Sequence, residues 1–192
     1  MTNTPHNIKD GFYIFLAGKT QIDEFESWVY NSTELEEYLG SDEYMDFILF
    51  DYKQKGARYE IENLIYKHID KSEFEAWKVR ILLFDALNRT GDYTLAIRFF
   101  YDLYCHGYGF MENLGLGYGL TLDCPNSSYG VDNFEELTNE QKNQLVNSFY
   151  PEIQAEINKV LNWIDSGLII LTGNQDEHNC FEYIDNRSEV DK

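Results

Sequence analysis

Cys105 and His106 stand side by side in the sequence, and these two residue types together can carry out nucleophilic catalysis. A thiolate attacks an electrophilic carbon after a neighbouring imidazole has removed the thiol proton. Adjacent residues of a helix point in different directions, so the fold itself would have to bring the two side chains together. Most single cysteines instead behave as small apolar side chains. A hydrolase that uses Cys105 and His106 is therefore the least favoured of the alternatives that we keep.

The glycines of "GLGYGL", residues 115–120, suggest a loop that binds phosphate. A dinucleotide-binding fingerprint requires a third glycine three residues after the second, and that position is Leu120. A P-loop requires Gly-Lys-Ser/Thr, and no lysine lies between Arg98 and Lys142. Glycines between bulky residues instead indicate tight turns or close packing of the backbone.

The histidines and the paired carboxylates match no motif for a metal site or for acid–base catalysis. The histidines, which have no ligand spacing such as HExxH, are His6, His68, His106 and His178. Glycosidases and metal sites use paired carboxylates, but chance adjacency is expected in a chain with 34 Asp and Glu. The stretch "DEYMDFILFD" also lacks the glycine and the terminal glutamate of an EF-hand loop. We therefore expect no catalytic residue, no metal and no cofactor, and a protein that is not an enzyme.

The strongest chemical signal is a run of negative charge without compensating bases. Residues 20–52 contain ten acidic residues and no lysine or arginine, whereas acidic and basic residues nearly balance in residues 53–105. A balanced helix surface gains ion pairs between residues i and i+4, while unpaired like charges repel. Such a run is often only a solvated surface. Selection for a cationic partner would explain the missing lysines, and we take this as the working hypothesis.

Tyrosines beside the acidic residues could anchor such a partner, because a tyrosine ring is amphipathic and loses little entropy on binding. Packing in the core is the alternative role, and we favour it for Tyr38 and Tyr44 over Tyr30. The residues predicted to bind the partner are Asp23, Glu24, Glu26, Tyr30, Glu34, Glu36, Glu37, Asp42, Glu43 and Asp46.

Apolar residues recur at helical spacing through most of the chain, which predicts the elements that position these residues. Helices are expected from Thr20, from Ser32 or Thr33 to Gly40, over 56–69, from Ser72, over 93–104 after the cap Asp92, from Thr138, and over 151–167. Residues 41–50 fit either a helix or a buried strand. The segment 105–134 is predicted to be ordered but irregular, with one short strand. Residues 168–173 are predicted to form a β-strand. The polar residues after Gly173 either pair with this strand or fray.

Length and composition predict one folded domain. The chain has 192 residues, of which 43% are hydrophobic and 16% are aromatic, so it can bury a core. We expect a single domain over residues 1–192, with a helical core at about 14–173 and a polar tail at 174–192. Its fold class is mainly α, with helical hairpins and a small β element near the C-terminus.

The charge also limits the classes of partner. At a formal net charge of −19, the chain lacks the basic patch that nucleic acid or an anionic membrane requires. The run "GFYIFLAG" is too short for a membrane span or for the apolar part of a signal peptide. Three cysteines without a CxxC pair indicate reduced thiols, so we expect a cytoplasmic protein.

Three stretches of the chain resemble a known family. They are "FESWVYNSTELEEYLGSDEYMDFILFDY", "FEAWKVRILL" and "LYCHGYGFMENLGLGYGL", and the similarity runs from about residue 14 to 173. The family consists of small acidic immunity proteins of Bacillota, encoded beside polymorphic or contact-dependent toxins. The matching residues are of the packing type and assign no role in binding: Phe25, Trp28, Leu35, Leu39, Gly40, Asp51 and Tyr52.

The resemblance and the charge together predict an immunity protein that binds and neutralises a cognate toxin domain. We expect that domain to be a basic nuclease, because its phosphate-binding cleft is positive and would accept a surface rich in carboxylates. The alternatives are a general protein-interaction or scaffold module with another partner, and the hydrolase described above.

Overall fold

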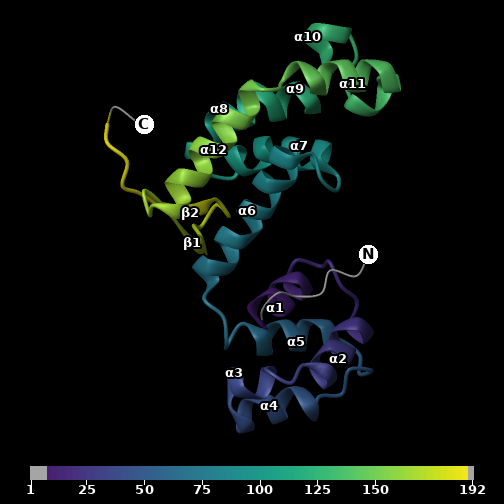
Figure 1. Cartoon of the computed structure of the whole chain (residues 1–192), viewed down its shortest axis with the longest axis vertical. Helices are drawn as coiled ribbons and strands as arrows, with labels where there is room; N and C mark the ends of the chain where they lie inside the picture. Colours follow the sequence, from purple (N-terminus) through teal and green to yellow (C-terminus); the bar gives the residue numbers. More distant parts are fainter. Residues whose placement is uncertain (1–7, 190–192) are drawn as a thin grey trace. The chain divides into compact units, whose positions relative to one another are not determined.

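The computed structural model describes residues 8–189, apart from the side chains of residues 127 and 128. The fold is mainly α-helical with one small antiparallel sheet near the C-terminus, which confirms the predicted fold class (Figure 1). The ends of the predicted domain, including His6, lie outside the described residues. No helix among residues 8–189 is long and apolar enough to cross a membrane.

The chain divides into two compact units, Met1–Phe74 and Glu75–Lys192, which we call unit 1 and unit 2. The boundary falls near the start of one helix, α6 (Lys71–Asn88), so its backbone continues from one unit into the other. Two compact units can still unfold together, so the single domain predicted from the sequence stays a prediction.

Unit 1 consists of short helices around an aromatic core. Its helices before α6 are α1 (Ile8–Leu16), α2 (Ile22–Asn31), α3 (Leu35–Leu39), α4 (Ser41–Ile48) and α5 (Ala57–Ile65). Phe12 is fully buried, and its ring stacks on Phe47 with the ring centroids 5.5 Å apart. The rings of Phe15 and Phe25 lie 4.3 Å apart in the same core. Helix α1 was not predicted, while residues 41–48 adopt the helical one of the two predicted alternatives.

A glycine allows α1 and α2 to approach closely. A Cβ atom on Gly11 would lie only 2.2 Å from the indole ring of Trp28. The ring also meets Phe12 edge-on, at 5.5 Å between centroids. Residue 11 must therefore be glycine for Trp28 to lie against α1 in this position.

Unit 2 is built on α6, α7 (Tyr93–Cys105) and α12 (Glu152–Asp165), with α11 (Asn139–Ser148) before α12. The predicted cap at Asp92 is confirmed by its hydrogen bond, and Thr138 caps the helix that was predicted to begin near it. The Asp92 carboxylate accepts from the backbone N–H of Leu95 at 3.1 Å, and the Thr138 hydroxyl accepts from that of Gln141 at 3.3 Å. Each side chain satisfies a backbone donor that has no partner within its helix.

Most of the glycine-rich segment 105–134 is helical, and the short strand predicted there is absent from it. It forms a succession of short turns of helix: η1 (Gly109–Met111), α8 (Glu112–Leu114), the π-helical turn η2 (Gly115–Gly119), α9 (Leu120–Asp123), α10 (Asn126–Tyr129) and η3 (Phe134–Glu136). Figure 1 shows α12 lying along α8, and the two helices are in contact.

Two of the glycines explain how this segment packs so closely on α7. A Cβ on Gly115 would lie 2.8 Å from the Cβ of Tyr104, and one on Gly119 would lie 2.7 Å from the backbone nitrogen of Tyr101. Both glycines therefore let the segment pack directly on the backbone of α7, which was one of the two roles predicted for them. They do not form a phosphate-binding loop, because they lie within continuous turns of helix.

The sheet near the C-terminus pairs β1 (Ile169–Gln175) with β2 (Phe181–Asp185), so the polar tail pairs rather than frays. Ile169 and Leu171 are buried, while Ile170 points outward and faces Ile184 across the strands. The ring of Phe181 stacks on that of Tyr108, with the ring centroids 4.9 Å apart, and this contact holds the hairpin against the rest of unit 2.

Candidate protein-binding surface

The residues predicted to bind a partner lie on or beside α2, α3 and α4, all of them in unit 1. All are exposed except Glu26, which is half-buried. Within residues 8–189, no ion pair involves any of the nine acidic residues in this set. Basic residues of unit 1 pair elsewhere, as Arg58 does with Glu62 at 2.9 Å and Lys9 with Glu73. The negative charge of this part of unit 1 is therefore uncompensated by neighbouring side chains.

Helix positions account for some of this charge. The first turns of α2, α3 and α4 each contain two acidic residues: Asp23 and Glu24, Glu36 and Glu37, and Asp42 and Glu43. Acidic side chains stabilise the positive N-terminal end of a helix dipole. Glu26 and Asp46 lie beyond the first turns, so the dipoles do not explain them.

Glu24 has a defined structural role. Its carboxylate accepts hydrogen bonds from the backbone N–H of Gln21 at 2.9 Å and from the hydroxyl of Thr20 at 2.8 Å. These hydrogen bonds lower the pKa of the Glu24 carboxyl below its ordinary value, because they favour the charged form. The capping pair of α2 is thus Gln21 and Glu24, one residue after the predicted helix start at Thr20. Glu24 belongs to the fold more than to a binding surface.

Helix α4 and the residue that caps its C-terminus present a continuous exposed stripe. Its residues follow at the spacing i, i+3, i+4 and i+7, and all four are exposed: Asp42, Met45, Asp46 and Leu49. On the opposite side of the helix, Phe47 is fully buried in the aromatic core. The burial of Phe47 thus turns two acidic and two large apolar side chains towards solvent.

Tyr30 of α2 continues this stripe. Its hydroxyl donates to the backbone carbonyl of Ile48 at 3.4 Å, and its ring meets Tyr52 edge-on at 6.2 Å. Tyr30 is 50% exposed, Met45 43% and Leu49 75%, so three large side chains are accessible in one region. We call Tyr30 and the four stripe residues the α4 surface.

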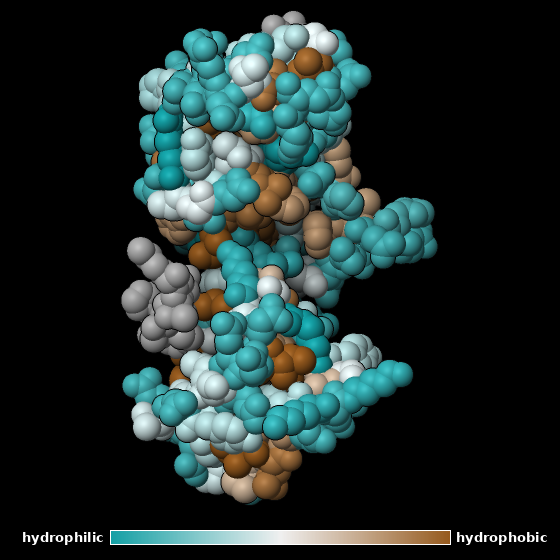
Figure 2. All heavy atoms as spheres, turned by 90° about the vertical axis from the view of Figure 1, so that its right-hand side faces the viewer, coloured by the Kyte–Doolittle hydropathy of each residue, from teal (hydrophilic) through white to brown (hydrophobic). Residues whose placement is uncertain are grey.

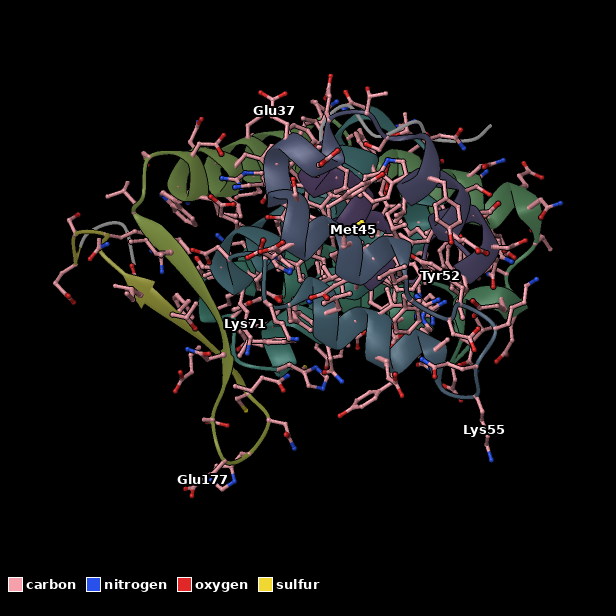
Figure 3. All side chains as sticks on the ribbon, turned by 90° about the horizontal axis from the view of Figure 1, so that it is seen from below. Glu37, Met45, Tyr52, Lys55, Lys71 and Glu177 are labelled. Atoms are coloured by element: carbon pink, nitrogen blue, oxygen red, sulfur yellow. The ribbon has the colours of Figure 1, made fainter. Side chains whose placement is uncertain are left out.

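The figures show where the α4 surface lies in unit 1. Figure 2 shows brown atoms exposed among teal ones on the lowest part of unit 1, where Figure 1 places α4. In Figure 3, which looks onto α4, Met45 lies near the middle of this face and Glu37 projects at its margin. Tyr52 lies to one side of Met45 in the same view.

The other predicted residues are placed differently. Glu34 precedes α3, and Glu36 accepts a hydrogen bond from the Ser41 hydroxyl at 3.0 Å, where α3 meets α4. Glu43 lies on the flank of α4 beside Gly40. The structure therefore brings Tyr30, Asp42 and Asp46 together with two apolar residues, and leaves the acidic residues of α3 beside them.

Met45 and Leu49 were missed by sequence reasoning. Residues 41–50 were left open between helix and strand, and only the helical spacing places the two side chains beside Asp42 and Asp46. The ranking of the tyrosines agrees with the structure in part. Tyr30 is more exposed than Tyr38, which is 40% exposed and donates through its hydroxyl to the carbonyl of His68 at 3.3 Å.

The two side chains of the candidate pair Cys105 and His106 have different partners. His106 Nδ1 lies 2.7 Å from the Asp102 carbonyl oxygen, which identifies Nδ1 as the protonated donor. The Cys105 thiol instead interacts with the hydroxyl of Tyr101, whose pKa it raises. No hydrogen bond joins Cys105 to His106 within residues 8–189, and no group of three or more His, Cys, Asp or Glu side chains there could hold a metal ion.

Unit 2 contains a buried carboxylate that sequence reasoning did not single out. Glu75 is 6% exposed, and its carboxylate pairs with Lys78 at 2.7 Å. Burial raises the pKa of the Tyr108 hydroxyl, and the nearby Glu75 carboxylate raises it further. Lys78 also lies over the ring of Phe181, at 5.9 Å from the centroid. This cluster fixes the C-terminal hairpin, and its charge is balanced internally.

Comparison with models of known protein families, with curated proteins and with solved structures finds no match to this chain.

Proposed function

We propose that the chain binds a cationic protein domain through the acidic part of unit 1 and thereby neutralises it, as an immunity protein does with a toxin. The family resemblance supports a toxin as the partner. The target that best fits the charge is a basic nuclease, whose cleft attracts the phosphates of nucleic acid. Carboxylates on a rigid surface can occupy such a cleft in place of phosphates.

One observation carries the proposal. A folded, well-packed region holds nine acidic residues that make no ion pair within residues 8–189, and it exposes Tyr30, Met45 and Leu49 among them. A surface that served solubility alone would need the charge but not the exposed apolar side chains. Charge attracts the partner over distance, while apolar contacts hold it once bound.

The test is co-expression with the C-terminal domain encoded by the adjacent gene. We expect the chain to restore growth to cells that express this domain and to co-purify with it. The association rate should fall by about tenfold or more between low and high salt, because screening shortens the reach of the charges. An unrelated basic domain of similar charge serves as the control and should neither bind stably nor be inhibited.

Three outcomes count against the proposal or a part of it. If growth is not restored and no complex forms, the adjacent domain is not the target and neutralisation is rejected. If a complex forms but toxicity persists, the chain is a general protein-interaction module. An association rate that is indifferent to salt would remove the acidic region from the mechanism.

A further inference from the structure

We propose that the α4 surface is the centre of the interface, and that the partner presents an apolar depression flanked by lysine or arginine side chains. This inference rests on the proposed function and deepens it. It assigns different roles to different residues: Met45, Leu49 and Tyr30 hold the complex together, and Asp42 and Asp46 select a cationic partner.

Met45 and Leu49 are exposed, so they can contact a partner, and they are not part of the buried core. Leu49 is 75% exposed although it directly follows a helix that buries Phe47 completely on its other side. Its backbone takes part in the fold, since its N–H donates to the Met45 carbonyl at 2.9 Å. Exposed leucine and methionine one helical turn apart give α4 an apolar ridge that nothing within residues 8–189 covers.

Tyr30 adds a side chain that is held in position before binding. Its hydroxyl bonds to the Ile48 carbonyl at 3.4 Å, and its ring rests edge-on against the buried Tyr52. Half of the tyrosine surface nevertheless remains accessible. A preorganised ring loses little conformational entropy on binding, and tyrosines of this kind are frequent at the centres of interfaces.

The charge on the same stripe decides which occupant fits. Asp42 lies three residues before Met45 and Asp46 three residues before Leu49, so each apolar side chain has a carboxylate on the same side of the helix. A second copy of the chain would bring equal negative charges together, and an anionic membrane would be repelled in the same way. A cationic protein surface can satisfy both the carboxylates and the apolar ridge.

The test measures association and dissociation rates for the full chain and the C-terminal domain of the adjacent gene's product. Leu49→Ser and Met45→Ser should each raise the dissociation rate by about tenfold or more and leave the association rate nearly unchanged. The double variant Asp42→Asn, Asp46→Asn should lower the association rate about threefold or more at low salt and weaken its dependence on salt.

Matched controls lie outside the α4 surface. Tyr59 on α5 is 70% exposed, so Tyr59→Ser removes an equally accessible apolar side chain and should leave both rates unchanged. The double variant Asp102→Asn, Glu112→Gln removes two exposed charges from unit 2 and should change the association rate less than the α4 pair does. Circular dichroism and thermal unfolding confirm that every variant is folded.

The outcomes separate this inference from the proposed function. If the complex forms and the apolar α4 variants dissociate no faster than Tyr59→Ser, the α4 surface is not the centre and the proposed function still stands. If the domain forms no complex with the unmodified chain, both are rejected. Faster dissociation of the apolar variants, with the controls unchanged, supports the inference.

Discussion

Gly115, Gly117 and Gly119 lie within one helical turn of each other but differ in their surroundings. The first and third face the backbone of α7, where an added Cβ would lie 2.8 Å or less from the nearest heavy atom. A Cβ on Gly117 would have no heavy atom within 4 Å. The spacing of these glycines therefore reflects helix packing and not the recognition of a phosphate group.

Gly115→Ala and Gly119→Ala should each lower the free energy of unfolding by about 1–3 kcal/mol, because the new methyl group forces α7 and η2 apart. Gly117→Ala is the matched control. It should leave this free energy unchanged or raise it by up to ~1 kcal/mol, since alanine is the better helix former. Denaturant unfolding followed by circular dichroism measures the three differences. Equal destabilisation by all three variants would contradict the packing role.

Helices α3 and α4 show how one charged segment divides between roles. The acidic residues of α3 stand beside the α4 surface, and Glu36 uses its carboxylate to bond Ser41. At this position they contribute to the electrostatic field of unit 1 without contacting the proposed centre. Long-range charge affects the association rate, whereas contacts at the centre set the dissociation rate.

Replacing Glu34, Glu36 and Glu37 together by glutamine should therefore slow association with the cationic partner about threefold and leave dissociation unchanged. The variant should stay folded, because a glutamine at position 36 can still accept from the Ser41 hydroxyl. Stopped-flow mixing at low and high salt measures the rates. As a control, Glu112, Glu140 and Glu152 of unit 2 are replaced by glutamine. If the α3 variant associates as fast as the unmodified chain, α3 plays no part in attraction.

At the scale of the whole molecule, the buried core is divided between the two units, whereas the negative charge is not confined to one of them. Acidic residues are spread over both units, yet each unit has its own buried apolar cluster. Unit 1 buries phenylalanines from α1, α2 and α4, and unit 2 buries a cluster drawn from α6, α7, α12 and the sheet. Separate cores suggest that a change in one core affects mainly its own unit.

Gly11→Ala tests this expectation, because its new methyl group would overlap the ring of Trp28 in the core of unit 1. Amide hydrogen exchange should become faster in α1, α2 and α5 by about tenfold or more, which corresponds to a loss of about 1.4 kcal/mol or more. Exchange in α7 and α12 should not change. Equal acceleration in both units would instead support the single cooperative domain predicted from the sequence.

Local sequence determined much of this protein: the mainly helical class, the cap at Asp92, the helix start near Thr138, and a surface charge with too few bases to balance it. These properties follow from the chemistry of residues that are close in the sequence, so they can be predicted without the tertiary structure. The tertiary structure alone decided that residues 41–48 form a helix and that Met45 and Leu49 face solvent. It also decided that Gly115 and Gly119 pack on α7. Each of these outcomes depends on which distant surface a residue meets, such as the ring of Phe12 against Phe47, and spacing along the chain does not contain that information.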